Sequence, residues 1–434
     1  MDPVYIAIIG IVVMCVFMAM GMPIAFAMLC AGLLGNAYML SGPAATHLMA
    51  TNVWEQFSSY GLSVVPLFVL MGQFAYRAGV TERLFEAAYQ WLGRTPGGLA
   101  STTVATAAGF SAISGSNAAT TATIGTIALP EMRRYRYDPT LSAGAVAVGG
   151  TLGVLIPPSV VLIVIAVQTE QSLLRLFLAA IVPGLILAAL LILTILMLCL
   201  LKPALGPAGP RTGWKQKFRA LSGVFETLLL FTLVIGGMYG GLFTPTEAAA
   251  AGAFGALAIG LVQRRLNLRN VVLSIAETLR ISAMVLLLIA GAVLFGRFLT
   301  VSRLPFDLAE WATSLPVDPA VILLVVLLIF LVGGALMDAL GFLIISIPIF
   351  FPLGIALGFD PVWFSILLTV VTTMGAITPP VGVNVFIVHG LAPDIPIHRV
   401  FYGVAYFAAA YVLCIAAMWI FPDTVLWLPR MLMG

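Results

Sequence analysis

The chain has 434 residues, of which 62% are hydrophobic and only 9% are charged, and its mean hydropathy is +1.13. Soluble domains carry charges on about a quarter of their residues, so this composition excludes a soluble globular protein and indicates a polytopic membrane protein. The formal net charge is +3, and the basic residues lie in short loops between apolar segments, which argues against nucleic-acid binding.

Apolar segments long enough to cross a bilayer, which takes about 20 residues, recur along the whole chain. No basic cluster precedes the first segment and no small-residue cleavage site follows it, so we expect a span there and not a signal peptide. Simple spans are predicted at 4–20, 22–40, 61–78, 173–201, 224–242, 245–263, 282–300 and 398–421.

Four further apolar segments are interrupted. Two long ones, 140–168 and 361–391, contain Pro-Pro pairs and are predicted to be broken helices. Two others, 98–130 and 319–352, are broken near their middle by SGSN and GGALMD. Breaks of the second kind suit re-entrant hairpins better than simple spans. The predicted fold is therefore all-α, with about ten membrane-crossing helices and two re-entrant helical hairpins.

Lysine and arginine mark the cytoplasmic side of a membrane protein. The first sixty residues contain neither, whereas sixteen of the twenty basic residues fall in loops that share one side when the spans alternate. The remaining four lie near the other face: Arg175, Arg297, Arg303 and Arg430. This pattern predicts that both termini are periplasmic, that the 98–130 hairpin enters from the cytoplasm and that the 319–352 hairpin enters from the opposite side.

The two halves of the chain match each other at a constant difference in residue number. Adding 222 carries Pro23, Pro130, Pro139, Pro157 and Pro158 onto Pro245, Pro352, Pro361, Pro379 and Pro380. Because the charge pattern orients the two copies oppositely, the sequence predicts a first inverted repeat at 1–201 and a second at 222–434. A basic cytoplasmic linker, 202–221, joins them. Inverted repeats with broken helices are typical of secondary transporters.

The same offset also aligns the elements that carry polar chemistry. The tip SGSN (114–117) matches residues 336–339, which include Asp338, and GVLIPPS (153–159) matches GAITPPV (375–381). Paired prolines remove backbone donors, so the carbonyls just before them lack helical partners. Such carbonyls, together with hydroxyls and a carboxylate, are hard oxygen ligands that suit Na⁺, and half-helix N-termini favour an anion.

Two cation sites near the bilayer midplane follow from this alignment. The first combines Ser114, Ser116 and Asn117 with carbonyls of 153–157, and the second combines Asp338 with carbonyls of 375–379 and the hydroxyl of Thr378. Structural alternatives remain open at this stage. Ser and Gly also permit close helix packing in membranes, Asp338 could instead reach periplasmic water, and Arg297 could either meet an anionic substrate or extend to the outer face.

These residues and their order resemble the large membrane subunit of TRAP transporters, the tripartite ATP-independent periplasmic transporters. The resemblance covers nearly the whole chain and rests on GMPIAF (21–26), SGSNAATTATIG (114–125), GVLIPPS (153–159), GLFTPTEAAA (241–250), LMDALGFLIISIPIFFPL (336–353) and TPPVGVNVF (378–386). It implies a fold of the ion-transporter superfamily, in which a transport domain with both hairpins moves as an elevator against a scaffold. It also implies sodium-driven import of a small organic acid anion, a carboxylate or a sulfonate, across the bacterial inner membrane.

The resemblance further implies two partners and a set of site residues. The partners are a periplasmic substrate-binding protein and a small four-helix membrane subunit, which we expect as a separate chain because no four-helix block flanks the repeats. Sodium site 1 is assigned Ser114, Gly115, Ser116, Asn117, Gly153, Ile156 and Pro157, and sodium site 2 is assigned Gly334, Met337, Asp338, Gly375, Thr378 and Pro379. The substrate candidates are Ser116, Asn117, Thr120, Ser159, Asn384 and Arg297.

One departure from the family pattern concerns the first hairpin. Many members carry an Asp a few residues after SGS, where this chain has residues 117–120, NAAT. No cofactor and no metal other than sodium is expected. GxxxxGK[ST], HExxH and GxSxG are all absent from the sequence, so the chain is not expected to be an enzyme. A self-sufficient sodium/anion symporter without a binding protein is the alternative, and a channel is a further one.

Overall fold

The computed structural model describes residues 3–210 and 213–433, and within these two ranges the backbone forms helices, turns and loops but no strand. Arg211 of the predicted linker lies outside them. The helices of the first half are α1 (Pro3–Ala19), α2 (Ile24–Met39), α3 (Gly42–Ser58), α4 (Val64–Arg77), α5 (Val80–Leu92), α6 (Gly98–Ser114), α7 (Asn117–Arg134), α8 (Pro139–Leu155), α9 (Val160–Thr169) and α10 (Leu173–Leu201).

The second half begins after the short linker. Its helices are α11 (Trp214–Ala220), α12 (Ser222–Phe231), α13 (Gly237–Tyr239), α14 (Pro245–Val262), α15 (Leu268–Val301), α16 (Leu304–Ser314), α17 (Pro319–Leu336), α18 (Ala339–Ala356), α19 (Pro361–Gly375), α20 (Val383–Leu391), α21 (Ile397–Ala405), α22 (Ala408–Ile420) and α23 (Asp423–Met433). A π-helical turn at Thr232–Gly236 joins α12 to α13, so these three pieces form one segment.

The chain is a multi-pass membrane protein. In the described part of the chain, seven helical segments are long and apolar enough to cross a bilayer, and two bent helix pairs would raise this number to nine. One bent pair joins α3 to the following turn and α4 at 53°, and the other joins α21 to α22 at 42°. The second pair corresponds to the single span predicted at 398–421, which therefore bends near its middle.

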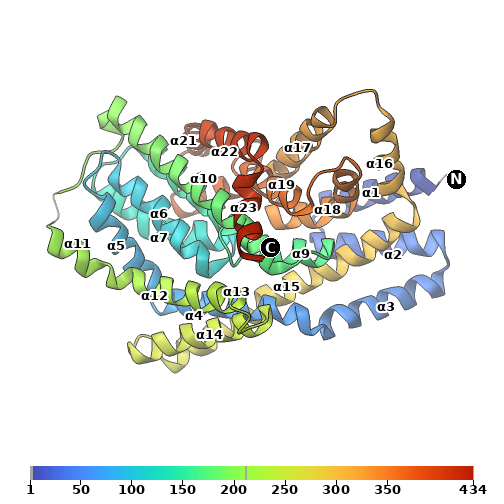
Figure 1. Ribbon diagram of the computed structural model, residues 1–434, viewed down its shortest axis with the longest axis horizontal. Helices are drawn as coiled ribbons and strands as arrows, with labels where there is room; N and C mark the ends of the chain where they lie inside the picture. Colours follow the sequence, from blue (N-terminus) through green and yellow to red (C-terminus); the bar gives the residue numbers. More distant parts are fainter. Residues whose placement is uncertain (1–2, 211–212, 434) are drawn as a thin grey trace.

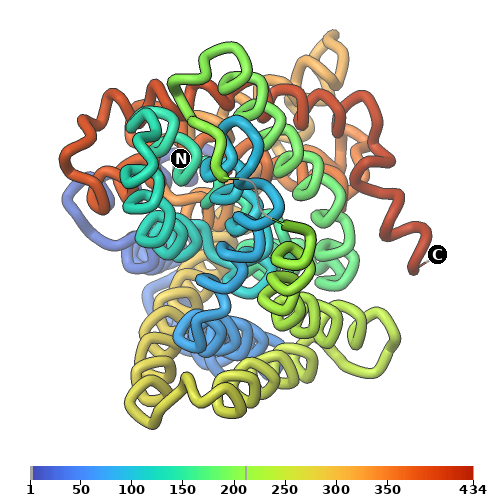
Figure 2. The backbone as a smooth tube through the Cα atoms, turned by 90° about the vertical axis from the view of Figure 1, so that its left-hand side faces the viewer, coloured from blue at the N-terminus to red at the C-terminus, as the bar shows by residue number. Residues whose placement is uncertain are grey.

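Two groups of helices build the molecule. In the α15 group, α15 packs along α2, α3 and α4, and α14 packs along α4. In the hairpin group, α8 packs against α6, α7 and α21, while α17 packs against α19. Figure 1 places most of the α15 group in its lower part and α10, α17, α19, α21 and α22 in its upper part. The turned view in Figure 2 keeps the same separation, with yellow helices of the α15 group below and orange and red ones above.

The helix boundaries repeat along the chain. With 222 added to each residue number, the bounds 117–134 of α7 become 339–356, which are the bounds of α18. The same shift takes the start of α8 at Pro139 to the start of α19 at Pro361. Both predicted breaks are present, because α8 ends before Pro157-Pro158 and α19 ends before Pro379-Pro380. At the two predicted hairpins the chain forms the helix pairs α6–α7 and α17–α18, and both α17 and α18 are long and apolar enough to cross a bilayer.

The break between α8 and α9 lies deep inside the protein. In the segment Pro139–Thr169, which contains α8, the break and α9, 94% of the most apolar 18-residue stretch is buried within the protein. Irregular backbone at membrane depth is tolerated only where protein or a cavity covers it, since lipid offers no hydrogen bonds. The break between α8 and α9 meets this requirement, because protein covers it.

The linker is attached to the base of the first hairpin. The N–H of Gly97 donates to the carbonyl of Gly206 at 2.9 Å, and the N–H of Asp138 donates to Leu205 at 2.9 Å. The hydroxyl of Tyr137 donates to the Pro207 carbonyl at 2.8 Å and accepts from the N–H of Leu99 at 3.1 Å. These bonds hold the chain leaving α10 against the start of α6.

Helix α15 is much longer than the span predicted at 282–300, with 34 residues from Leu268 to Val301. The polar residues of 268–281 lower the hydropathy there, but this stretch contains neither proline nor glycine, so nothing ends the helix. The equivalent region of the first half is not continuous. It is divided into α3 and α4 by a bend at Ser59–Ser63.

Candidate ion and substrate site

The tip of the first hairpin is a tight connection between two helices. Helix α6 ends in Gly115, whose left-handed backbone (φ +62°) lets its N–H donate to the carbonyl of Ser111 at 3.1 Å. Ser116 follows in an extended conformation and caps α7, with its Oγ accepting from the N–H of Ala119 at 3.4 Å. The sequence SGS is therefore sufficient to end one helix and begin the next within two residues.

The tip is packed against the break between α8 and α9. The N–H of Val160 donates to the carbonyl of Gly115 at 3.1 Å. A Cβ atom at Gly115 would lie only 2.6 Å from the Pro158 carbonyl oxygen. A Cβ atom at Gly153 would lie 2.5 Å from the Ser116 carbonyl oxygen. Glycine at both positions is thus what allows the two backbones to approach so closely.

This approach gathers backbone oxygens around the tip. Because residues 157 and 158 are prolines without N–H groups, the carbonyls of Gly153 and Val154 lack the helical donor four residues on. Ile156 was also predicted to contribute its carbonyl. It follows the last residue of α8, and its N–H donates to the carbonyl of Leu152 at 2.9 Å. The first break therefore leaves two carbonyls without their helical donors, and Gly153 packs closely against Ser116 and Thr120.

The second hairpin has an analogous tip with a carboxylate. Asp338 caps α18, and its Oδ2 accepts from the N–H of Leu340 at 3.1 Å. The N–H groups of Val381 and Gly382, just after the second proline pair, donate to the Ala335 carbonyl at 3.2 and 3.0 Å. Here two of the carbonyls before the prolines already have donors, since Gly375 accepts from the N–H of Thr378 at 2.7 Å and Ala376 accepts from the N–H of Asn384 at 3.2 Å.

Both tips face one cavity of about 590 Å³. Ser114, Gly115, Ser116 and Asn117 line it from the first tip, and Asp338 lines it from the second. The starts of the half-helices α9 and α20 contribute Val160 and Val383. Helices α4 and α15 form the opposite wall. The structure therefore brings together, at one cavity, elements that come from both halves of the chain.

Several buried polar atoms near the first tip have no partner, and of their residues Asn117 lines the cavity whereas Thr120, Ser159 and Asn384 do not. Asn384 Nδ2 donates to Asn117 Oδ1 at 2.7 Å and to the Ala147 carbonyl at 2.8 Å. Within residues 3–210 and 213–433, however, no partner lies in hydrogen-bonding reach of Asn117 Nδ2, Asn384 Oδ1, Thr120 Oγ1 or Ser159 Oγ. Thr120, Ser159 and Asn384 are fully buried. Buried polar groups normally have partners, so this cluster is suited to a polar ligand or an ion.

The donor set fits a hard monovalent cation better than a transition metal. Among the described residues, no group of three or more His, Cys, Asp or Glu side chains is placed to hold a metal. The available ligands are backbone carbonyls, hydroxyls and one carboxylate. Oxygen ligands of this kind coordinate Na⁺ at broken helices in transporters.

The remaining predicted residues lie in different surroundings. Gly334 is packed against α19, where it lets the backbone approach Gly375. Met337 ends α17 in an extended conformation. The hydroxyl of Thr378 donates to the Met374 carbonyl at 2.7 Å and lines a separate cavity of about 430 Å³ beside His398. Thr378 therefore does not face the large cavity.

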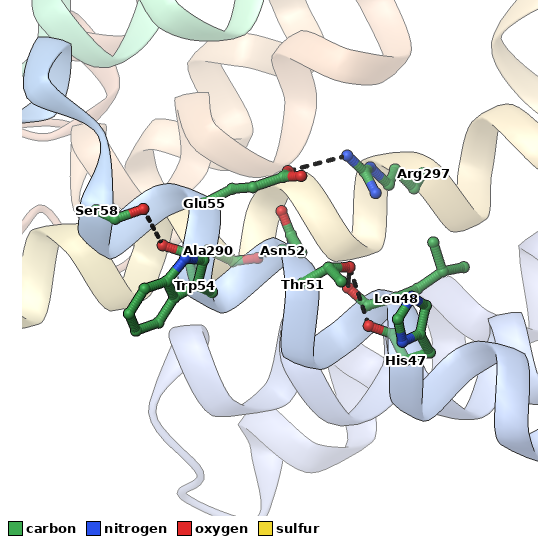
Figure 3. Close-up of polar contacts among 9 residues, drawn as sticks. All are labelled: His47, Leu48, Thr51, Asn52, Trp54, Glu55, Ser58, Ala290 and Arg297. Atoms are coloured by element: carbon green, nitrogen blue, oxygen red, sulfur yellow. Dashed lines mark hydrogen bonds and ion pairs between the residues drawn. The ribbon is translucent and has the colours of Figure 1, made fainter.

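Arg297 is not brought to the hairpin tips. Its guanidinium lies 3.5 Å from the carboxylate of Glu55 on α3, and it does not line the large cavity. Figure 3 shows this ion pair bridging α3 and α15 beside Asn52, whose Nδ2 donates to the Ala290 carbonyl at 3.1 Å. The position of Arg297 gives no support to the substrate role expected from the sequence.

Other polar and charged residues of the cavity were missed in the sequence. Gln73 and Arg77 on α4 and Glu277 on α15 line it opposite the tips. Arg77 had contributed only to the charge pattern of the loops. No local motif marks these residues, because their role depends on α4 and α15 packing beside the first hairpin.

Two solved structures share this arrangement of helices. The YdaH transporter of Alcanivorax borkumensis superposes with a TM-score of 0.63 at 18% identity, over 88% of this chain and 90% of that one. The MtrF structure of Neisseria gonorrhoeae, titled as one of a class of antimetabolite efflux pumps, gives 0.57 at 13% identity, over 87% and 85%. At such identity the likeness concerns the fold alone, an all-helical membrane fold that this chain shares with both proteins.

The family follows from sequence comparison. Residues 11–424 match the family model described as the tripartite ATP-independent periplasmic transporter, DctM component, and the chain belongs to this family. It is a transporter permease and not an enzyme. It is 38% identical over 350 residues to the C4-dicarboxylate TRAP transporter large permease protein DctM of Pseudomonas aeruginosa, covering 80% of this chain and 82% of that protein. It is 35% identical to the isethionate TRAP transporter permease protein DctMQ of Oleidesulfovibrio alaskensis, covering 87% and 59%.

Proposed function

We propose that this chain imports a small organic acid anion, a carboxylate or a sulfonate, across the bacterial inner membrane with a sodium gradient as the driving force. The observation that carries the proposal is the single cavity onto which both hairpin tips and the starts of α9 and α20 open. Relatives named for a C4-dicarboxylate and for isethionate support this substrate class.

The proposed sodium sites use the oxygens that the fold gathers. Site 1 combines the tip residues Ser114 and Ser116 with the carbonyls freed by Pro157 and Pro158, and site 2 combines Asp338 with the backbone around Gly375. The buried atoms without partners at Asn117, Thr120, Ser159 and Asn384 are proposed to meet the substrate or its hydration shell. The N-termini of α7 and α9 beside them favour a negative charge.

We infer that the hairpin group moves against the α15 group as an elevator, and that the two halves are inverted repeats. The recurrence of the same helix bounds in the two halves supports the repeat. The basic loops support an orientation with both termini periplasmic. In that orientation the cavity opens to the cytoplasm, because Arg77 at the cytoplasmic end of α4 lines it. A periplasmic substrate-binding protein and a small four-helix membrane subunit are the proposed partners, supported by membership of the family.

The test is transport by the chain and its small subunit in proteoliposomes, with radiolabelled succinate and isethionate as probes and the binding protein outside. Uptake against a gradient that requires external sodium, and that potassium cannot replace, is the expected result. Uptake without the binding protein would favour the self-sufficient symporter. Equilibration that does not saturate and ignores the sodium gradient would contradict the proposal and indicate a channel.

A further inference from the structure

Arg77 is the one cationic side chain among the residues that line the large cavity in the described chain. The two carboxylates on the same cavity, Asp338 and Glu277, would repel an anion. An organic anion that leaves the hairpin tips through this cavity can therefore meet one positively charged side chain among the described lining residues, that of Arg77.

Arg77 forms no ion pair with any of the residues that the structure describes. No carboxylate oxygen of the described residues lies within 4.0 Å of its guanidinium, and its buried Nε has no hydrogen-bond partner there. Arg77 is nevertheless half-buried. Charges removed from water are normally paired with an opposite charge. A half-buried arginine that faces a cavity and has no such partner is therefore suited to bind an anion.

The position of Arg77 on α4 relates it to the hairpin tip. Gly72 is where α4 touches the tip, since a Cβ there would lie 3.3 Å from Ser114 Cα. Arg77 follows five residues later, about 7 Å further along the helix axis. Gln73, one turn before Arg77, lines the cavity between these two points. An anion released at the tip would thus reach Arg77 next.

Arg77 and the tip belong to different helix groups. Arg77 is part of α4 in the α15 group, whereas Ser116 is part of the hairpin group. A movement of one group against the other separates them, so the arginine and the tip share one cavity only in the arrangement seen here. Glu277 on the neighbouring α15 does not take the place of the anion, because it forms no ion pair with Arg77.

We propose that Arg77 is a specificity-determining residue of the permease, which binds the carboxylate or sulfonate of the substrate only while the cavity faces the cytoplasm. This inference rests on the proposed function. It assigns to α4 a site for an organic anion that is separate from the hairpin tips. Its consequence is a side-specific affinity, in which Arg77 contributes to binding from the cytoplasm and not from the periplasm.

The test measures the half-saturation concentration for succinate on each side of the membrane, using the full chain with its small subunit in proteoliposomes of known orientation. Sodium-dependent succinate exchange is recorded while the concentration is varied on one side at a time. Arg77→Gln is expected to raise the cytoplasmic half-saturation concentration at least about tenfold and to leave the periplasmic value within about twofold. Arg77→Lys should fall between, because it keeps the charge but loses the planar fork.

The matched control is Arg280→Gln. Arg280 lies on α15 three residues after Glu277, is exposed and does not line the cavity. The substitution should change neither value. An Arg77→Gln protein with an unchanged cytoplasmic value, or with equal changes on both sides, would overturn the inference while leaving the proposed function intact. If Arg77→Gln fails to fold, a wild-type value in Arg77→Lys would overturn it. A wild-type protein without sodium-dependent exchange would refute the proposed function itself.

Discussion

Asn384 donates a 2.7 Å hydrogen bond to Asn117, although 267 residues separate them in the sequence. Asn117 begins α7 at the first hairpin tip, and Asn384 lies in the first turn of α20 after the second proline pair. The bond therefore joins a tip from one half of the chain to a half-helix from the other. Both side chains are buried, and Asn117 also lines the large cavity.

The two asparagines should be energetically coupled. Asn384→Ala leaves Asn117 Oδ1 without its donor in a buried position, and we expect a loss of about 1–3 kcal/mol in the free energy of unfolding. Asn117→Ala should cost a similar amount, and the double variant less than the sum of the two. Chemical unfolding in detergent of all four proteins measures this cycle. Strict additivity would mean that the bond contributes nothing.

Sodium should stabilise the protein through both tips. At about ten times its dissociation constant, a ligand specific to the folded state adds roughly 1.4 kcal/mol. We expect the thermal midpoint to rise with NaCl but not with KCl, and the rise to weaken in Ser116→Ala and in Asp338→Ala. Asp318→Ala is the matched control, because Asp318 also caps a helix, with Oδ1 accepting from Ala320 at 2.8 Å, but lies outside the cavity. An identical sodium response in all variants would argue against both sites.

Gly115→Ala tests how closely the tip must approach the break. Its left-handed backbone (φ +62°) costs an alanine about 1–2 kcal/mol, and the new Cβ would also meet the Pro158 carbonyl at 2.6 Å. We expect loss of transport together with lower stability. Gly241→Ala separates the two effects, because Gly241 has a similar φ of +67° but no atom within 4 Å of the added Cβ. Equal behaviour of the two variants would mean that the close approach is unimportant.

Arg297 should have no effect on substrate affinity. Its side chain and that of Glu55 are 42% and 59% exposed, and such a surface ion pair contributes roughly 0–1 kcal/mol. Arg297→Gln is therefore expected to keep the wild-type half-saturation concentration for uptake and nearly the wild-type thermal midpoint. A large increase in that concentration would restore the substrate role that the sequence suggested.

Tyr137 gives the linker attachment a dependence on pH. Burial raises the pKa of its phenol to about 12, against the opposing effect of the hydrogen bond from the Leu99 N–H. A raised pKa means that the folded state holds the proton after the unfolded state has lost it. The resulting stabilisation is complete below pH 10 and is lost as the pH rises toward 12. Comparing thermal midpoints of wild type and Tyr137→Phe across this range, we expect their difference to shrink with rising pH, and a constant difference would contradict the assignment.

Local chemistry explains which elements were predictable. Two adjacent prolines end a helix wherever they occur, so the breaks at Pro157 and Pro379 were predicted correctly, and the spans at 173–201 and 245–263 agree with α10 and α14 to within a residue. Hydropathy did not detect α3, α5 or α16, which mix polar and apolar residues. It also shortened α15, since a helix that leaves the membrane remains a helix.

The site was predictable only where sequence motifs carry it. SGSN and Asp338 stand out because polar groups interrupt apolar stretches, and both face the cavity. Arg77 and Glu277 resemble ordinary charges at the ends of spans. Their place beside the tips depends on how α4 and α15 pack, and the pairing of Asn117 with Asn384 depends on the contact between the two halves.

The length of α15 links the protein to the thickness of its membrane. Its 34 residues extend about 51 Å, and even a tilt of about 40° leaves roughly 39 Å along the membrane normal, against a hydrocarbon core of about 30 Å. At least about two turns therefore stand outside the hydrocarbon core, and Arg269, Glu277 and Arg280 all lie in the first four turns. Glu277, which lines the cavity, belongs to this polar end of α15. Bilayers of different acyl-chain length or headgroup charge should alter the rate at which an anion leaves the protein.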